Sequence, residues 1–112
     1  MNIEQAIKEY LEQIKRNYLS RYGLENYPAD RLEFIKTMQQ EWIDSVKYKV
    51  CAKYIKVTAG TSVHSFIVTE DGIKFKAGDI LKAAGWNAPA KNFARGNVFA
   101  PSTYELVSWT GA

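Results

Sequence analysis

The 112-residue chain has only one cysteine, one histidine and three prolines, and it has no long run of apolar residues. The single cysteine, Cys51, excludes an internal disulfide, and together with the lack of a signal peptide it favours a reducing, cytoplasmic location. Lysines interrupt the apolar clusters, so no window approaches the roughly 18 apolar residues that a membrane helix needs. We therefore expect one domain, residues 1–112, without a membrane segment.

Groups that carry catalysis or bind metals are also scarce. His64 is the only histidine, and with Cys51 alone it cannot complete a zinc site, which needs three or four ligands. Glu70 and Asp71 stand at a predicted hairpin tip, where acids commonly form turns, and no phosphate-cradling or dinucleotide fingerprint occurs. We expect no enzyme, no metal and no cofactor. The alternative, a hydrolase or transferase, would require His64, Cys51 or Asp79 to converge in a pocket.

Charge is divided unequally along the chain. Residues 1–44 contain six Lys or Arg and eight Asp or Glu, whereas residues 45–112 contain nine Lys or Arg and four Asp or Glu. The second part is thus modestly basic. A basic module is typical of proteins that bind nucleic acid or an acidic protein, and it also occurs in ordinary domains with solvated lysines.

The first part has the pattern of two helices. Apolar residues recur at three- and four-residue steps at Ile3, Ile7, Tyr10, Leu11, Ile14 and Tyr18. This spacing predicts an amphipathic helix over about residues 2–22, with Gly23 as its C-terminal stop. Asp30 and Glu33 predict a capping box for a second helix, which ends near residue 45. The connection is short, so we expect an antiparallel pair.

The pattern then changes to the alternation of strands. Lysines and larger apolar residues alternate from residue 47, and the phase slips at Tyr54, which indicates a bulge or two successive strands. An alternative is that the second helix continues, because Trp42, Val46 and Val50 are also four apart. The density of Val, Ile, Thr and Tyr favours a strand.

Further along, residues 62–69 predict a strand, residues 73–76 a return strand after the turn at Asp71 and Gly72, and residues 104–109 an edge strand. Residues 79–84 fit a short helix or a strand. The prediction is an α+β fold, with two N-terminal helices packed on one face of a small antiparallel sheet of three to four strands. Residues 1–46 form the helical hairpin and residues 47–112 the basic β-rich half.

Residues 85–97 have an unusual composition for a core segment, since they combine Trp, Phe, Pro, two Gly, three Asn and two cations. We expect a loop with one helical turn near residues 88–95. Aromatic rings beside cations are typical of loops that contact phosphates or bases. The predicted contact residues are Lys56, Lys82, Trp86, Lys91, Phe93, Arg95 and Asn97. The alternative is a closing clasp of the fold, with Trp86 in the core and Arg95 paired with Asp79.

The same stretch carries a resemblance. Gly78–Trp86, Ala88–Lys91 and Ala94–Asn97, preceded by Lys53–Val57 and Ser62–Phe66, resemble a family of small, uncharacterised bacteriophage proteins with a C-terminal W-x-A-P-A-K…A-R-G-N signature. This chain has two residues, Asn92 and Phe93, as a longer spacer within the signature. The resemblance implies a phage origin and a bacterial cytoplasm, and it implies no particular activity.

Two functions follow as hypotheses. The first is a small non-enzymatic protein that binds nucleic acid through its basic, aromatic C-terminal half, with Trp86 and Phe93 stacking on bases and Lys82, Lys91 and Arg95 contacting phosphates. The second is a phage protein that binds and modulates a bacterial host protein through residues 86–97, because Trp and Arg dominate the binding energy of such interfaces.

Overall fold

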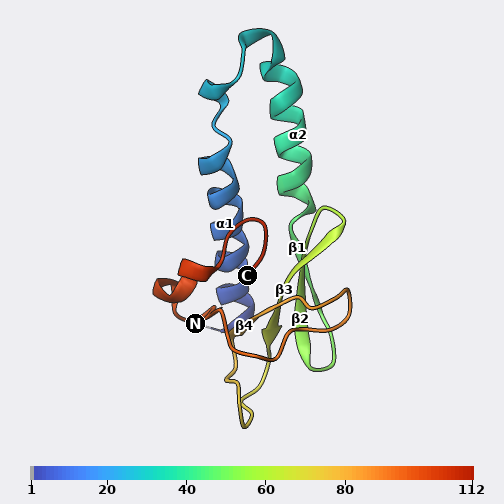
Figure 1. Cartoon of the computed structure of the whole chain (residues 1–112), viewed down its shortest axis with the longest axis vertical. Coiled ribbons are helices and arrows are strands. Elements are labelled where there is room, and N and C mark those ends of the chain that lie inside the picture. Colours follow the sequence, from blue (N-terminus) through green and yellow to red (C-terminus); the bar gives the residue numbers. More distant parts are fainter. Residues whose placement is uncertain (1) are drawn as a thin grey trace.

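The computed structural model, which describes residues 2–112, shows a helical hairpin standing on a small antiparallel sheet (Figure 1). Helices α1 (Ile3–Arg21) and α2 (Leu32–Ser45) are joined by two short 3-10 turns, Leu24–Asn26 and Ala29–Arg31. The hairpin extends well beyond the sheet, and the molecule measures 54 × 27 × 24 Å. The predicted α+β class and the N-terminal pair of helices are confirmed.

Helix α1 forms as its sequence pattern predicts. Asn2 caps its N-terminus, because the Asn2 side-chain oxygen accepts a hydrogen bond of 2.8 Å from the Gln5 amide. Its apolar face is buried through Ala6, Ile7, Tyr10, Leu11 and Ile14. This face covers one side of the sheet, so α1 supplies most of the helical part of the core.

Helix α2 differs from the prediction at its start and in its packing. Asp30 lies in a 3-10 turn rather than at a helix cap, and Arg31, at the cap position, makes no side-chain capping bond. Gln39 is the only buried residue of α2, and its side-chain amide donates to the Tyr22 carbonyl oxygen at 2.5 Å. Trp42 packs against the main core. Helix α1 therefore covers the sheet, and α2 meets the core at its C-terminal end.

The sheet has five strands in the order β1-β2-β3-β4-β5, and every neighbouring pair is antiparallel. The strands are β1 (Lys47–Val50), β2 (Tyr54–Ala59), β3 (Ser62–Val68), β4 (Asp79–Lys82) and β5 (Gly96–Asn97). The prediction of three to four strands is one short, because the two-residue β5 lies inside the segment predicted as a loop. The phase slip at Tyr54 marks two successive strands, and helix α2 does not continue into this region.

Other local predictions were wrong. Residues 73–76 form no strand, and residues 88–95 contain an isolated bridge between Ala83 and Pro89 instead of a helical turn. The predicted edge strand at residues 104–109 begins within a 3-10 helix, Pro101–Leu106. Proline at the start of that segment has no amide hydrogen and a φ suited to a helical turn, which favours the 3-10 helix over a strand.

The two faces of the sheet bury different clusters. On the α1 face, the helix packs on Ile55, Val57, Ile67 and Ile80 from three central strands. The opposite face, here called the outer face, holds a smaller cluster of Phe66, Val68 and Leu81, which is covered by loop residues such as Phe75 and Ala94. No helix in residues 2–112 is long and apolar enough to cross a membrane.

Strand β3 contains a bulge that controls which side chains reach each face. Val57 pairs with Ser65 and the next residue, Thr58, pairs with Val63, so His64 has no partner in β2. One extra residue reverses the alternation of the strand. As a result His64 and Ser65 both face Tyr10 of α1, while Val63 joins the cluster on the outer face.

Candidate functional site

Lysines gather on the outer face of the first two strands. Lys49 on β1 pairs directly with Lys56 on β2, and Lys56 pairs with Phe66, which belongs to the outer cluster. Lys47 lies two residues before Lys49 and therefore points to the same face. Lys47 and Lys49 are exposed, and Lys56 is half-buried. We call Lys47, Lys49 and Lys56 the lysine row.

The lysine row has no local anionic partner. Residues 45–69 contain four lysines and no Asp or Glu. The ion pairs among residues 2–112 are Lys15 with Glu12 and Lys36 with Glu33, all on the helices. Like charges directly opposite each other across two strands are unfavourable. The outer face is thus a cationic surface that an anion would stabilise.

Trp86 stands beside this row. The loop of residues 83–95, between β4 and β5, runs sideways from β4 across the sheet (Figure 1), and Asn87 accepts a hydrogen bond of 3.1 Å from the Lys56 ammonium group. The same Lys56 nitrogen lies 4.7 Å from the centroid of the Trp86 ring, in a cation–π contact. Trp86 remains 56% exposed. The alternative in which Trp86 is a core residue is therefore wrong.

Phe93 and Arg95 form a second aromatic–cation pair on the same loop. The guanidinium carbon of Arg95 lies 3.9 Å from the centroid of the Phe93 ring, and Asn92 accepts a hydrogen bond of 3.3 Å from Arg95. Phe93 is 49% exposed, whereas the Arg95 Nε atom is buried without a hydrogen-bond partner. The backbone amide of Arg95 donates to the Ile80 carbonyl oxygen at 2.7 Å. This bond anchors the loop next to β4.

Asn97 has a structural position. Its side-chain amide donates to the Ala77 carbonyl oxygen and to the Asp79 carboxylate, at 3.1 and 2.9 Å, and its side-chain oxygen accepts from the Phe99 amide. Asp79 is thus held by Asn97 rather than by Arg95, which corrects the alternative pairing. Because its side chain is engaged in these bonds, Asn97 connects the segment at Ala77–Asp79 with β5, and its side-chain amide is not free to bind a ligand.

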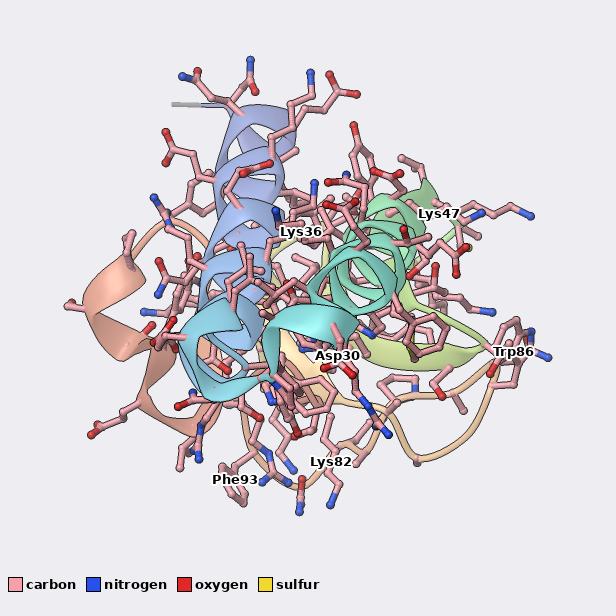
Figure 2. The ribbon with its side chains drawn as sticks, turned by 90° about the horizontal axis from the view of Figure 1, so that it is seen from above. Asp30, Lys36, Lys47, Lys82, Trp86 and Phe93 are labelled. Atoms are coloured by element: carbon pink, nitrogen blue, oxygen red, sulfur yellow. The ribbon has the colours of Figure 1, made fainter. Side chains whose placement is uncertain are left out.

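The seven predicted contact residues do not form a single cluster. Lys56 and Trp86 meet, and Phe93 and Arg95 meet, but Trp86 and Phe93 project on different sides of the molecule (Figure 2). Lys82 is exposed and projects between these two positions in that view. Lys91 is exposed, and its carbonyl oxygen accepts a bond from the Lys74 side chain. The predicted contact residues therefore form two separate aromatic–cation pairs.

Three residues next to the pair of Lys56 and Trp86 were not predicted from the sequence. Lys47, Lys49 and Asn87 are not among the seven predicted residues. The alternation of lysine and apolar residues from residue 47 already indicated that the lysines share one face. The contact between Lys56 and Asn87 joins residues 31 positions apart, and no local pattern indicates it.

His64 belongs to a buried polar chain. The Tyr10 hydroxyl lies 2.8 Å from Ser65 Oγ, Ser65 Oγ lies 2.9 Å from His64 Nδ1, and His64 Nε2 lies 2.6 Å from the Ser108 carbonyl oxygen. A carbonyl oxygen only accepts, so Nε2 carries the hydrogen and Nδ1 accepts from Ser65, which in turn accepts from Tyr10. Burial lowers the pKa of His64, and the bond to Ser108 opposes this shift.

The hydrogen-bonded series of Tyr10, Ser65 and His64 contains a serine and a histidine but does not have the accessibility of a catalytic pair. Ser65 is fully buried, so no substrate reaches its hydroxyl, and both nitrogens of His64 are engaged. Cys51 is exposed in the turn after β1, and Asp79 bonds Asn97, so neither joins His64. Within residues 2–112, no three His, Cys, Asp or Glu side chains lie together where they could hold a metal ion.

Comparisons of the chain with protein-family models, with curated proteins and with solved structures found no match.

Proposed function

We propose that this protein binds single-stranded nucleic acid, without catalysing a reaction, through the lysine row and Trp86. The observation that carries the proposal is the direct pairing of Lys49 with Lys56, unneutralised and next to an exposed indole ring. Single-strand binders combine cations that follow the phosphate backbone with aromatic rings on which bases stack.

In this proposal the lysines contact the phosphate backbone of the nucleic acid, and Trp86 stacks on a base. The Cα atoms of Lys47 and Lys49 lie about 6.6 Å apart along β1, as those of alternate residues in a strand do. Their side chains would contact successive phosphates. Lys56 covers one face of the Trp86 ring, and more than half of that residue's surface is open to receive a base. Because Asn87 also holds Lys56, the indole ring is oriented before the ligand arrives.

The test is fluorescence anisotropy with labelled single-stranded DNA, single-stranded RNA and duplex DNA of equal length, over a salt titration. We expect the single strands to bind more tightly than the duplex, with an affinity that falls steeply with salt. A triple variant, Lys47→Gln, Lys49→Gln and Lys56→Gln, is expected to lower the salt slope by about two, since about 0.7 unit is lost for each phosphate contact.

The matched control is Lys8→Gln, Lys15→Gln and Lys36→Gln, which removes the same charge from the helices. We expect it to bind like the unaltered chain. Absence of binding at low salt, or equal losses in the two triple variants, would overturn the proposal, because general positive charge rather than the lysine row would then be responsible.

A second candidate function is binding to a bacterial host protein through Phe93 and Arg95. The stacking of half-buried Arg95 on exposed Phe93 favours it, since aromatic and arginine side chains dominate the binding energy of protein interfaces and a stacked guanidinium is already ordered. The phage origin implied by the sequence resemblance, with its bacterial cytoplasm, is part of this proposal. A pull-down from bacterial lysate tests it. A captured protein that is retained equally by Phe93→Ala plus Arg95→Ala would contradict it.

A further inference from the structure

Helix α2 has an apolar stripe that the fold leaves uncovered. Ile35, Gln39 and Trp42 are spaced by four and three residues and form its inward side. Phe34 and Met38 lie about a quarter turn away and are 65% and 50% exposed. Figure 1 shows α2 standing beyond the sheet, so no strand covers this side.

The stripe is bordered by opposite charges. Arg31 precedes Phe34 by three residues, and Glu41 follows Met38 by three, so all four residues lie along one side of the helix. Arg31 and Glu41 are both exposed, and neither belongs to an ion pair among residues 2–112. We call Arg31, Phe34, Met38 and Glu41 the lateral stripe.

The lateral stripe is complementary to itself when reversed. Phe34 and Met38 lie two residues on either side of position 36, and Arg31 and Glu41 lie five residues on either side of it. An antiparallel copy related by a two-fold axis at this point therefore brings Phe34 against Met38 and Arg31 against Glu41, twice over. A two-fold interface requires such reciprocal contacts. A parallel copy would instead place like charges together.

We propose that the lateral stripe is the contact surface for a second copy of this chain, in an antiparallel α2–α2 dimer. The complementary charges of Arg31 and Glu41 favour a second copy of the same chain in the antiparallel direction. Phe34 and Met38 supply the apolar contact area. A single pair of helices buries a small area, so the dimer is weak and reversible. This proposal is independent of nucleic-acid binding, because none of its residues belongs to the lysine row.

Sedimentation velocity over about 10 µM to 1 mM protein tests the dimer, a range that covers the dissociation constants of small interfaces. We expect a concentration-dependent shift from monomer to dimer mass. Phe34→Glu should abolish the shift without lowering the melting temperature, since Phe34 is already exposed. A monomer at all concentrations, or a dimer that Phe34→Glu leaves unchanged, would overturn the proposal.

Charge reversal tests the direction. Arg31→Glu alone and Glu41→Arg alone each place two like-charge contacts in the dimer, and we expect each to raise the dissociation constant by roughly tenfold. The double variant, Arg31→Glu plus Glu41→Arg, restores both attractions and should recover dimerisation. Failure of the double variant to exceed the single variants would exclude the antiparallel register.

Cross-linking tests the register in a Cys51→Ser background. An equimolar mixture of Phe34→Cys and Met38→Cys chains should form mostly mixed disulfides, because these positions oppose each other. Either chain alone should cross-link more slowly. Equal rates in all three samples would contradict the register.

Discussion

The two faces of the sheet bury side chains in different ways. On the α1 face, a long helix covers aliphatic residues from three strands, and Tyr10, Ile67 and Ile80 are completely shielded from solvent. On the outer face, loops cover only Phe66, Val68 and Leu81, and the first two strands present lysines to solvent. The difference indicates that the α1 face contributes most of the packing that stabilises the fold, while the outer face leaves lysines of the first two strands in contact with solvent.

The largest expected effect is a loss of stability when a buried side chain on the α1 face is removed. Tyr10→Ala removes a fully buried ring that contacts Tyr104 edge-on at 5.4 Å, and we expect a loss of about 3–5 kcal/mol in the free energy of unfolding. Urea denaturation followed by circular dichroism measures it. Tyr54→Ala is the matched change on the outer face, where Tyr54 is only half-buried. Equal losses in the two variants would contradict the division between the faces.

The next effect is on binding. We expect Trp86→Ala to weaken single-stranded oligonucleotide binding by about 1–3 kcal/mol, the contribution of one stacked base, and to change the free energy of unfolding by less than about 0.5 kcal/mol. Trp86→Phe keeps a stacking surface and should retain most of the affinity. If Trp86→Ala destabilised the fold and left binding intact, the loop would be a structural clasp after all.

A smaller effect concerns pH. Burial lowers the pKa of His64 in the folded chain, so the unfolded chain binds more protons below the ordinary histidine pKa of about 6.5. Stability is therefore complete above about pH 6.5 and falls as the pH drops below it. Thermal melts between about pH 7.5 and 5.5 avoid most carboxylate titration. His64→Gln should show a flatter dependence than the unaltered chain, and an identical slope would exclude His64 as the cause.

The smallest expected effect is a gain in stability. Lys49→Gln relieves the like-charge pairing with Lys56, and we expect it to stabilise the fold by roughly 0.2–1 kcal/mol while it weakens nucleic-acid binding. Lys53→Gln, in the turn between the two strands, removes the same charge without a partner across the strands. A gain that is equal in both variants would indicate net charge rather than the pairing.

Sequence patterns were most informative where the contacts are local. The bounds of α1 follow from its apolar spacing, and the two strands on either side of Cys51 follow from the phase slip. Helix α2 shows the limit, since Asp30 and Glu33 match a capping box but the chain enters the helix through a 3-10 turn after Pro28. Proline restricts that entry independently of the capping pattern.

The candidate site was predictable only in part, because long-range contacts position it. The composition of residues 85–97 indicated an exposed loop, and Trp86 and Phe93 are indeed exposed. Nothing local shows that Gly96 and Asn97 pair with β4 or that Trp86 meets Lys56. The predicted contact residues are divided between two places for this reason, since the loop carries Trp86 and Phe93 to different sides of the molecule.

The bulge in β3 separates the register of this strand from its length. Because His64 is the extra residue, Ser65 pairs with Val57 and Val63 pairs with the next residue, Thr58. Deleting His64 would place Val63 directly before Ser65, so both pairs would keep their register and Val63 would stay in the outer cluster. The deletion would remove the hydrogen bonds of His64 with Ser65 and Ser108, while the start of the strand would keep the same inner and outer residues.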